Sequence, residues 1–357
     1  MSRNPLAATV LAVLAVLVSS AAAAPLGKAR VAVIQATGSE RQDPFVAGYD
    51  STQVRAMSQA HLDKLIRLIE RAGELGADIV CGPEDMQHIG GYGLHVDRTD
   101  PETGEILFNS LAEKVPGPLS ERLAAIAAKY SMYVVAPIYE KDGGKVYNST
   151  LVFDREGELI GRHHKTVLPI METWLVEPGT EYEVFQTDFA PVAISTCWEI
   201  TFPEIQRIYA LKGARLIFHP TMGHENENGK SLATAHRYLT RATDDRVWLA
   251  PVILGTDGNG IISPEGKVLA EAIGAADTVI VADIDFSEQF LSRSAWWNPI
   301  NGTDNERAIH FLSRRPDLWG YLTDPHPAIL AEFEKVRLTT GDRQAQLKAV
   351  ETVDYGP

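Results

Sequence analysis

Cysteine is scarce in this sequence. The 357 residues include only two cysteines, Cys81 and Cys197, and neither belongs to a CxxC motif. No HExxH motif is present either, so the sequence lacks the ligand spacings that are typical of zinc sites. In an exported protein, two cysteines could form one disulfide, but sequence cannot establish the distance between them.

Positive charge is also in short supply. Lys and Arg total 33 against 47 Asp and Glu, which gives a formal net charge of −14. An acidic chain of this kind is a poor candidate for binding nucleic acid or an anionic membrane. After residue 24, no apolar run approaches the length of a membrane span.

The longest apolar run lies at the N-terminus. Residues 6–18 are almost wholly apolar, follow Arg3 and precede the small residues 19–24. This order is typical of a cleavable signal peptide over residues 1–24, and an uncleaved anchor is the alternative. The sequence therefore predicts export to the periplasm or the outside of the cell.

The remaining chain, about 330 residues, alternates between strand and helix patterns. Short apolar runs predict buried strands, and apolar residues at helical spacing predict helices. This alternation favours layered sheets with helices on their outer faces. The predicted strands are 30–36, 78–81, 132–139, 146–153, 158–162, 191–196, 215–219, 247–253, 260–263, 267–270 and 278–285, and the predicted helices are 60–75, 119–130, 202–212 and 230–245.

The sequence changes character near its C-terminus. Residues 287–357 contain Trp296, Trp297 and Trp319, several prolines and many charges, with few strand patterns. Tryptophan is rarely left in a solvated tail, which favours packing of this extension on the body or on a partner subunit. A partly disordered extension is the alternative.

Three polar residues follow predicted strands. Glu84 comes after DIVCGP, Lys165 ends RHHK, and Cys197 follows AIST. Strand ends at one edge of a sheet are where α/β folds collect catalytic groups. A thiol, a carboxylate and an amine supply the nucleophile, the base and the cation of covalent acyl transfer. Taken singly, each has a structural alternative: a buried cysteine, a capping or ion-paired glutamate, and a solvated lysine.

The strings around these residues resemble the nitrilase superfamily of carbon–nitrogen hydrolases. ADIVCGPE at 77–84 resembles the family's strand that ends in Pro-Glu, and RHHK at 162–165 resembles the segment with the catalytic lysine. STCWEITFPE at 195–204 resembles the nucleophile elbow, and GARLIFHPT at 213–221 resembles the strand after it. The resemblance covers residues 29–286, which we interpret as one carbon–nitrogen hydrolase domain.

The resemblance implies a fold, a mechanism and an assembly. The fold is a four-layer α-β-β-α sandwich, and subunits pair as a homodimer or larger homo-oligomer in which sheets continue each other. Cys197 would be the nucleophile and Glu84 the general base, while Lys165 and the backbone N–H of Trp198 would stabilise the oxyanion. Neither a cofactor nor a metal is implied, and the substrate would be a small amide, N-carbamoyl compound or nitrile. A disulfide would destroy the nucleophile, so we expect free thiols, with Cys81 packed under Glu84.

The string METWLVEPG, shortly after the lysine, resembles the family segment with a second glutamate. We assign that role to Glu172, with Glu177 as the fallback, and expect it to hold the lysine and hydrogen-bond the leaving group or a water. A Gly-rich segment that includes Tyr92 is predicted to line the pocket mouth or to be a mere connection. His219 is predicted to end a strand near the pocket. Asn148 is predicted to be a turn or sheet-surface residue, although the family places this neighbourhood near the pocket.

Other classes of protein remain as alternatives. A binding protein could keep the fold without the chemistry, and a third reading is acyl transfer to an amine. The superfamily's lipoprotein N-acyltransferases are embedded in membranes, and this chain lacks the necessary spans. The string CWE is typical of nitrile-cleaving members and FPE of amidases and carbamoylases, so the sequence leaves the substrate open. A metal enzyme could use Glu225 and the histidines, although their spacing fits no ligand motif; the histidines are His163, His164, His219, His224 and His236.

Overall fold

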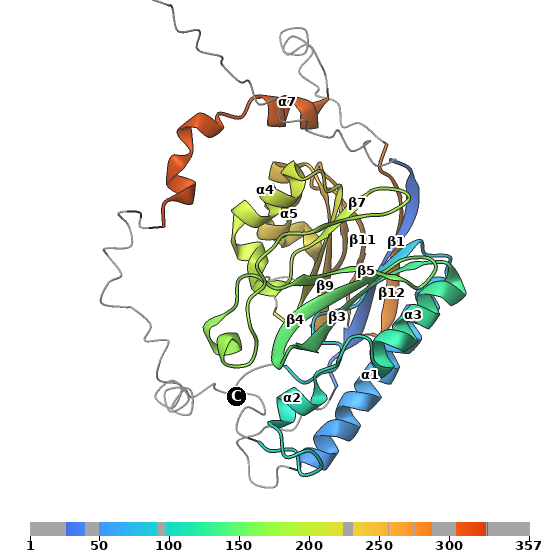
Figure 1. Cartoon of the computed structure of the whole chain (residues 1–357). Helices are drawn as coiled ribbons and strands as arrows, with labels where there is room; N and C mark the ends of the chain where they lie inside the picture. The colour runs from blue at the N-terminus through green and yellow to red at the C-terminus, as the bar shows by residue number, and fades with distance from the viewer. Residues whose placement is uncertain are drawn as a thin grey trace, which may run out of the picture.

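The computed structural model describes residues 26–39, 50–90, 98–223, 231–255, 257–274, 276–287, 305–325 and 327. Strands and helices alternate along these residues as the sequence predicts (Figure 1). No helix in this part of the chain is both long and apolar enough to cross a membrane. The predicted signal peptide and several residues singled out in the sequence lie outside the described residues: Tyr92, His224, Glu225, Trp296 and Trp297.

One half of the strands is built around β1. Strands β1, β2 and β3 run parallel, β4 and β5 continue from β3 in antiparallel order, and β12 pairs antiparallel with β1. The parallel strands are almost continuously apolar, which is expected of strands that are covered on both faces. Their bounds are β1 (Lys28–Thr37), β2 (Ile79–Cys81), β3 (Tyr133–Asp142), β4 (Lys145–Phe153), β5 (Leu159–His164) and β12 (Thr278–Asp285).

The other half is built around β8. Strands β7, β8 and β9 run parallel, β6 pairs antiparallel with β7, and β10 pairs antiparallel with both β9 and β11. The ends of β1 and β9 pair through Ala36 with Leu254 and Thr37 with Gly255, which joins the two halves. The bounds are β6 (Val184–Gln186), β7 (Pro191–Ile194), β8 (Leu216–Thr221), β9 (Trp248–Gly255), β10 (Asn259–Ile262) and β11 (Val268–Ala272).

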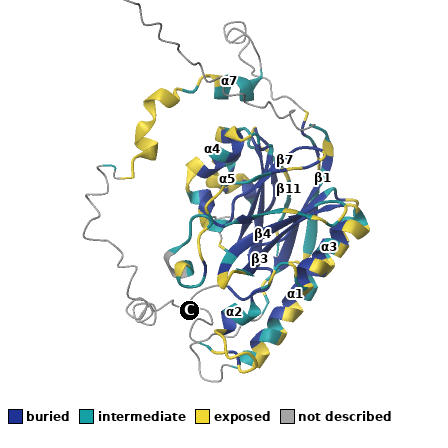
Figure 2. Cartoon of the chain, viewed as in Figure 1, coloured by how far each residue is buried: buried dark blue, intermediate teal, exposed yellow. Residues whose placement is uncertain are grey.

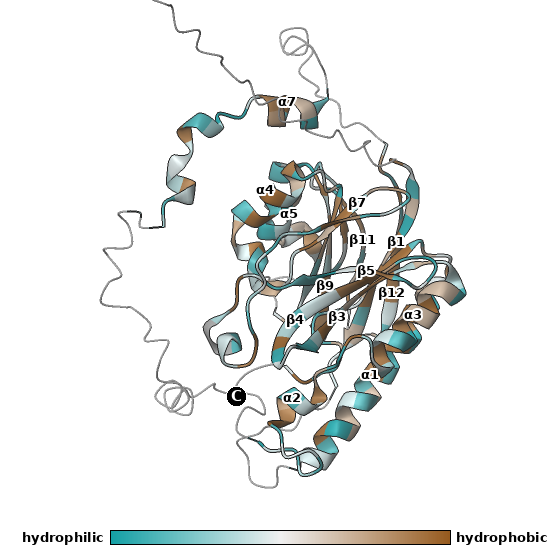
Figure 3. Cartoon of the chain, in the orientation of Figure 1, coloured by the Kyte–Doolittle hydropathy of each residue, from teal (hydrophilic) through white to brown (hydrophobic). Residues whose placement is uncertain are grey.

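Helices cover the outer face of each sheet. The apolar faces of α1 (Ser51–Glu74) and α3 (Pro118–Tyr130) pack on the β1 half, and those of α4 (Pro203–Leu211) and α5 (His236–Asp245) pack on the β8 half. Each helix is therefore buried on one side and exposed on the other (Figure 2), and the exposed sides carry the polar residues (Figure 3). A short helix, α2 (Leu107–Leu111), precedes α3.

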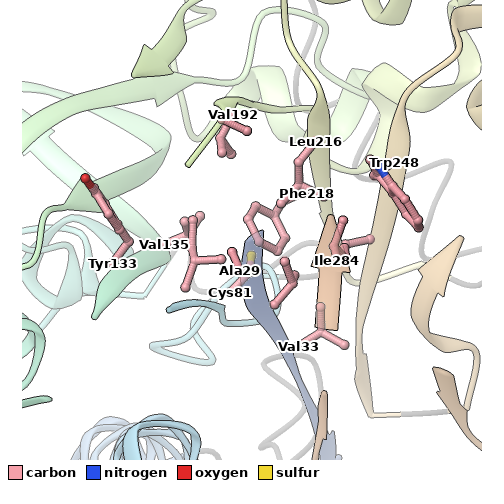
Figure 4. Close-up of a cluster of buried hydrophobic side chains, with 14 of the residues drawn as sticks. Ala29, Val33, Cys81, Tyr133, Val135, Val192, Leu216, Phe218, Trp248 and Ile284 are labelled. Atoms are coloured by element: carbon pink, nitrogen blue, oxygen red, sulfur yellow. The ribbon is translucent and has the colours of Figure 1, made fainter. Parts of the chain in front are cut away.

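The main core lies between the two sheets. Val33, Cys81 and Val135 project into it from the β1 half and meet Val192 and Phe218 from the β8 half (Figure 4). Helix, sheet, sheet and helix therefore follow one another as four layers, which confirms the predicted fold. Burial of apolar surface on both faces of each sheet is the dominant stabilising term of such an arrangement.

Two helices differ from the sequence prediction. The first helix begins at Ser51 instead of residue 60, because residues 51–59 are mostly polar and hide the helical period. Asp50 caps it by accepting a hydrogen bond from Thr52 N at 3.0 Å. The helix predicted at 230–245 is instead the 3-10 turn η3 (Leu232–Thr234) followed by α5.

The extension contains α7 (Glu306–Leu312), which contacts the body near the ends of α4 and α5. The Arg307 guanidinium donates to the carbonyl oxygens of Ala210 and Ala214 at 3.0 and 3.1 Å, and also to that of Arg246. These bonds tie α7 to the C-terminal end of α4 and to the residues that follow α4 and α5. The turns η4 (Pro316–Leu318) and η5 (Gly320–Thr323) follow α7.

Candidate active site

A cavity of about 580 Å³ opens beside the ends of strands from both sheets. It brings together Glu84, Lys165, Glu172, Cys197 and Trp198, five of the residues singled out in the sequence. The rest of its wall is formed by Gly38, Ser39, His88, Tyr139, Pro169, Leu175, Met222, Gly223, Leu254 and Gly255. A concave cavity with a few converging charged groups is the usual mark of a small-molecule site.

Glu84 lies three residues beyond β2, and its side chain is buried. One carboxylate oxygen accepts hydrogen bonds from Lys165 Nζ at 3.1 Å and Asn148 Nδ2 at 2.8 Å. The other accepts from the backbone N–H of Met222 at 2.7 Å. Three donors from three separate segments therefore fix this carboxylate at the cavity wall.

Lys165 follows β5 directly and is buried between two carboxylates. Its Nζ donates to Glu84 at 3.1 Å and to Glu172 at 2.6 Å. Burial acts to lower the pKa of Lys165, but the negative charges of Glu84 and Glu172 outweigh it and hold that pKa well above its usual range. The side chain is therefore a fixed ammonium ion at neutral pH.

Asn148 is the clearest correction to the sequence interpretation. It is neither a turn nor a sheet-surface residue, because it lies within β4 and is buried. Its Nδ2 donates to Glu84 Oε1 at 2.8 Å and to Glu172 Oε1 at 2.6 Å, so one amide holds both carboxylates. Asparagine is disfavoured inside strands, and its position within a strong strand pattern was the signal that could have revealed it.

Glu172 lies in the 3-10 turn η1 (Ile170–Trp174) and faces Lys165 and Asn148. Burial raises the pKa of Glu172, Lys165 opposes that rise, and the charge of Glu84 adds to it. The fallback residue, Glu177, is half exposed and pairs with Lys145 at 3.6 Å. The structure therefore places Glu172 in the cavity and Glu177 outside it.

Cys197 is the first residue of the 3-10 turn η2 (Cys197–Thr201), three residues after β7 ends. Its φ of +50° is in the left-handed region, which a residue with a side chain rarely adopts and which is common at functional sites. Burial of the thiol, followed by the nearby charge of Glu84, raises the pKa of Cys197 to about 12, although Lys165 acts in the opposite direction. The resting thiol is therefore protonated at neutral pH.

Both cysteines are free thiols, as the sequence analysis predicted. Cys81 belongs to β2 and is fully buried in the core between the sheets. Burial raises the pKa of its thiol well above the usual range. Cys81 is therefore an inert core residue, whereas Cys197 faces the cavity.

Of the three residues predicted to lie in or near the pocket, Trp198, His219 and Tyr92, the structure places only Trp198 at the cavity within its described part. Trp198 lines the cavity with 45% of its surface exposed, and its backbone N–H lies in the first turn of η2, where helices leave N–H groups unpaired. His219 is buried within β8 (Leu216–Thr221), two residues before the strand ends and not at its end as predicted, and it is not part of the cavity wall. Its Nδ1 contacts the Ser195 carbonyl oxygen at 2.7 Å. Burial lowers the pKa of His219 to about 4, so this ring is neutral. Tyr92 lies outside the described residues.

A buried ion pair that the sequence analysis did not anticipate lies behind the cavity. His163 Nε2 contacts Glu199 at 3.0 Å, and His163 Nδ1 contacts Glu183 at 3.2 Å. Burial would lower the pKa of His163, but the charge of Glu199 and the hydrogen bonds with Glu183 and Glu199 raise it to about 9. The imidazole is therefore a buried cation at neutral pH.

This ion pair predicts an alkaline loss of stability. The pKa of His163 is about 9 in the folded chain, against about 6.5 for an unperturbed histidine. The protonated imidazole therefore contributes up to about 3 kcal/mol to the free energy of unfolding. This contribution is present in full below pH 6.5 and is lost as the pH rises through 9. Urea unfolding of the wild type and of His163→Gln between pH 6 and 10 measures it. The wild type should lose more stability than the variant over this range, and parallel curves would contradict the assignment.

The histidines considered as metal ligands do not form a metal centre in the described part of the chain. Among those residues, no group of three or more His, Cys, Asp or Glu side chains is placed to hold a metal ion. His163 pairs with glutamates, His164 contacts Glu140 at 3.1 Å, and His219 contacts a backbone carbonyl.

The fold and the cavity together define an α-β-β-α sandwich that presents a thiol, an ammonium ion and two carboxylates at one site. The profile of the Carbon-nitrogen hydrolase family matches residues 30–289. The chain therefore belongs to the carbon–nitrogen hydrolase family, the nitrilase superfamily that its motifs resemble. It is an enzyme that acts on carbon–nitrogen bonds other than peptide bonds.

Curated relatives include both amide- and nitrile-directed enzymes. The chain is 31% identical over 254 residues to Omega-amidase NIT2 from Xenopus tropicalis, covering 65% of this chain and 85% of that protein. It is 30% identical over 307 residues to Bifunctional nitrilase/nitrile hydratase NIT4B from Lupinus angustifolius, covering 72% and 87%. The two are similarly distant, so identity alone does not select the substrate.

Solved structures share the fold. The NitFhit protein of C. elegans superposes with a TM-score of 0.60 at 19% identity, covering 83% of this chain and 67% of that one. A variant of the amidase from Nesterenkonia sp. AN1 superposes with a TM-score of 0.60 at 18% identity, covering 83% and 97%. That variant carries the acetamide moiety of fluoroacetamide, covalently added at its active-site cysteine.

Proposed function

We propose that this protein hydrolyses a small amide, N-carbamoyl compound or nitrile through a thioester on Cys197. The observation that carries the proposal is the cavity itself, which is lined by Cys197, Lys165, Glu84 and Glu172. A nucleophile, a cation and carboxylates within one site are the groups that covalent acyl transfer needs.

The first half of the reaction follows from the protonation states. Because the pKa of Cys197 is raised to about 12, the thiol loses its proton only as it attacks, and Glu84 accepts that proton. With an amide or N-carbamoyl compound, the Sγ–carbon bond forms while Lys165 and the Trp198 N–H stabilise the negative oxygen. Glu84 then returns the proton to the leaving nitrogen, the carbon–nitrogen bond breaks, and ammonia or an amine departs. With a nitrile, the sulfur adds to the carbon and Glu84 gives the thiol proton to the nitrogen, which forms a thioimidate; a water then adds to the same carbon, and ammonia leaves to give the thioester.

The second half hydrolyses the thioester. Glu84 takes a proton from a water, whose oxygen attacks the carbonyl carbon, and the carbon–sulfur bond breaks. The sulfur recovers its proton and the acid is released. Glu172 serves this half by holding Lys165 at 2.6 Å and by offering a second carboxylate to the water or leaving group.

Ammonia release from a substrate panel tests the proposal. The panel contains ω-amides of dicarboxylic acids, simple primary amides, aliphatic and aromatic nitriles, and N-carbamoyl amino acids, in line with the two kinds of relatives. Release from one class, with a thioester trapped on Cys197 by rapid acid quench and mass spectrometry, is the expected result. Turnover without any adduct on Cys197, or no turnover of any class, would contradict it.

We also propose a homo-oligomer and an exported mature protein. Large apolar residues at the end of α7 and after it are exposed in the single chain, among them Leu312, Leu318 and Tyr321, which supports a partner subunit. Light scattering on the purified protein tests the assembly, and a monomer would contradict it.

The apolar run 6–18 and the small residues after it support cleavage near residue 24. Mass spectrometry of the N-terminal peptide, on protein recovered from the periplasm or the medium, tests that cleavage.

A further inference from the structure

Glu199 lies two residues after Cys197, does not line the cavity, and is fully buried. Its carboxylate accepts hydrogen bonds from four donor groups, one of which, His163 Nε2, contacts both oxygens. Oε1 accepts from the backbone N–H and the hydroxyl of Thr166, at 2.8 and 2.7 Å. Oε2 accepts from the backbone N–H of Thr196 at 2.6 Å and from His163 Nε2 at 3.0 Å.

These partners belong to the two segments that carry the reactive groups. Thr166 is the neighbour of Lys165, at the end of β5 in one sheet. Thr196 is the neighbour of Cys197, after β7 in the other sheet. One carboxylate therefore spans the two sheets directly behind the thiol and the ammonium ion.

The arrangement is more than a local helix cap. The bond from Thr196 closes the first turn of η2, as a capping box does. The two bonds from Thr166 and the bond from His163 cross to a segment 33 to 36 residues away in sequence. A carboxylate that is hydrogen-bonded to charged and neutral donors in a buried setting is held rigidly.

We propose that Glu199 is a positioning residue that sets the placement of Cys197 relative to Lys165 by bonding the backbone next to each. His163 fixes the Glu199 carboxylate from behind, and Glu183 fixes His163 in turn. Glu199 does not touch the substrate. Its removal therefore lowers the rate of attack by the thiol, while substrate binding in the cavity is little changed. The proposal rests on the proposed nucleophilic role of Cys197.

Glu199→Gln tests the proposal, because the amide keeps the size of the side chain but turns one acceptor into a donor that faces N–H groups. Thr166→Val is a milder second variant that deletes only one hydroxyl donor. Glu204→Gln is the matched control, since Glu204 is an exposed carboxylate five residues further along the same segment. Each purified variant is assayed for kcat and KM, and for the rate at which iodoacetamide alkylates each cysteine.

Cys81 serves as the internal reference for folding, because this fully buried thiol reacts only when the core opens. We expect Glu199→Gln to lower kcat by about 10²-fold, the cost of displacing a reacting group by an ångström, with KM changed by less than about threefold. Alkylation of Cys197 should slow in parallel while Cys81 stays protected. Thr166→Val should show a several-fold loss in the same two rates, and Glu204→Gln should match the wild type.

Unchanged kcat and unchanged Cys197 alkylation in Glu199→Gln would overturn the proposal. If Cys81 becomes reactive in that variant, the fold has opened, and the test then rests on Thr166→Val. If Cys81 stays protected in Thr166→Val and both kcat and Cys197 alkylation equal those of the wild type, the proposal is also overturned. If the wild type hydrolyses nothing, the proposed function fails separately. The alkylation rates still report whether Glu199 positions the thiol.

Discussion

Replacing Cys197 with alanine is expected to abolish ammonia release from every substrate that the wild type hydrolyses. No other thiol faces the described cavity, because Cys81 is buried between the sheets. Loss of a hydrolase nucleophile costs on the order of 10⁶-fold in kcat, which places the residual rate below detection. Ammonia assays at matched protein concentration measure the loss, and thermal unfolding should show a midpoint close to that of the wild type.

Cys81→Ala is the matched control for this variant. It removes the same atom from a core site, so it should cost roughly 0.5–3 kcal/mol of stability and leave kcat unchanged. A Cys197→Ala protein that remained active would rule out the thioester mechanism. If Cys81→Ala lost activity without unfolding, Cys81 would be the nucleophile or would be coupled to it.

Replacing Lys165 with methionine is expected to lower kcat by at least about 10²-fold, the cost of losing one oxyanion donor. Methionine keeps the length of the side chain but removes the ammonium ion that bonds Glu84 and Glu172 at 3.1 and 2.6 Å. Two buried carboxylates then lose their counterion. Breaking a buried ion pair in this way destabilises a fold by about 3–5 kcal/mol, unless a carboxylate takes up a proton.

The Lys165→Met variant is measured by steady-state kinetics and by urea unfolding at pH 5 and pH 8. Burial raises the pKa of Glu172 in the wild type, so protonation of that carboxylate should make the variant less unstable at pH 5 than at pH 8. Lys145→Met is the control, because Lys145 is exposed and pairs with half-exposed Glu177. A Lys165→Met protein with wild-type kcat would exclude the lysine from the chemistry.

The predictable part of the site consisted of residues with a local signature. Glu84, Lys165 and Cys197 each follow a strand pattern, and the strings around them resemble one family. The choice of Glu172 over Glu177 rested on that resemblance, and of these two glutamates the structure places Glu172 in the cavity. Asn148 was assigned to a turn or the sheet surface although it lies in a predicted strand, and that pattern alone does not say that its amide reaches Glu84 and Glu172.

The sequence by itself determined the strands, most of the helices, the layered fold and the residue types of the site. Apolar periodicity reports which side of an element is buried, and that information is local. Only the tertiary structure decided that Asn148 holds two carboxylates and that Glu199 joins the segments of Lys165 and Cys197. These contacts link residues 24 to 64 positions apart in the case of Asn148 and 33 positions apart for Glu199 and Thr166. Such contacts depend on how segments far apart in the sequence pack within and between the two sheets, which no local pattern records.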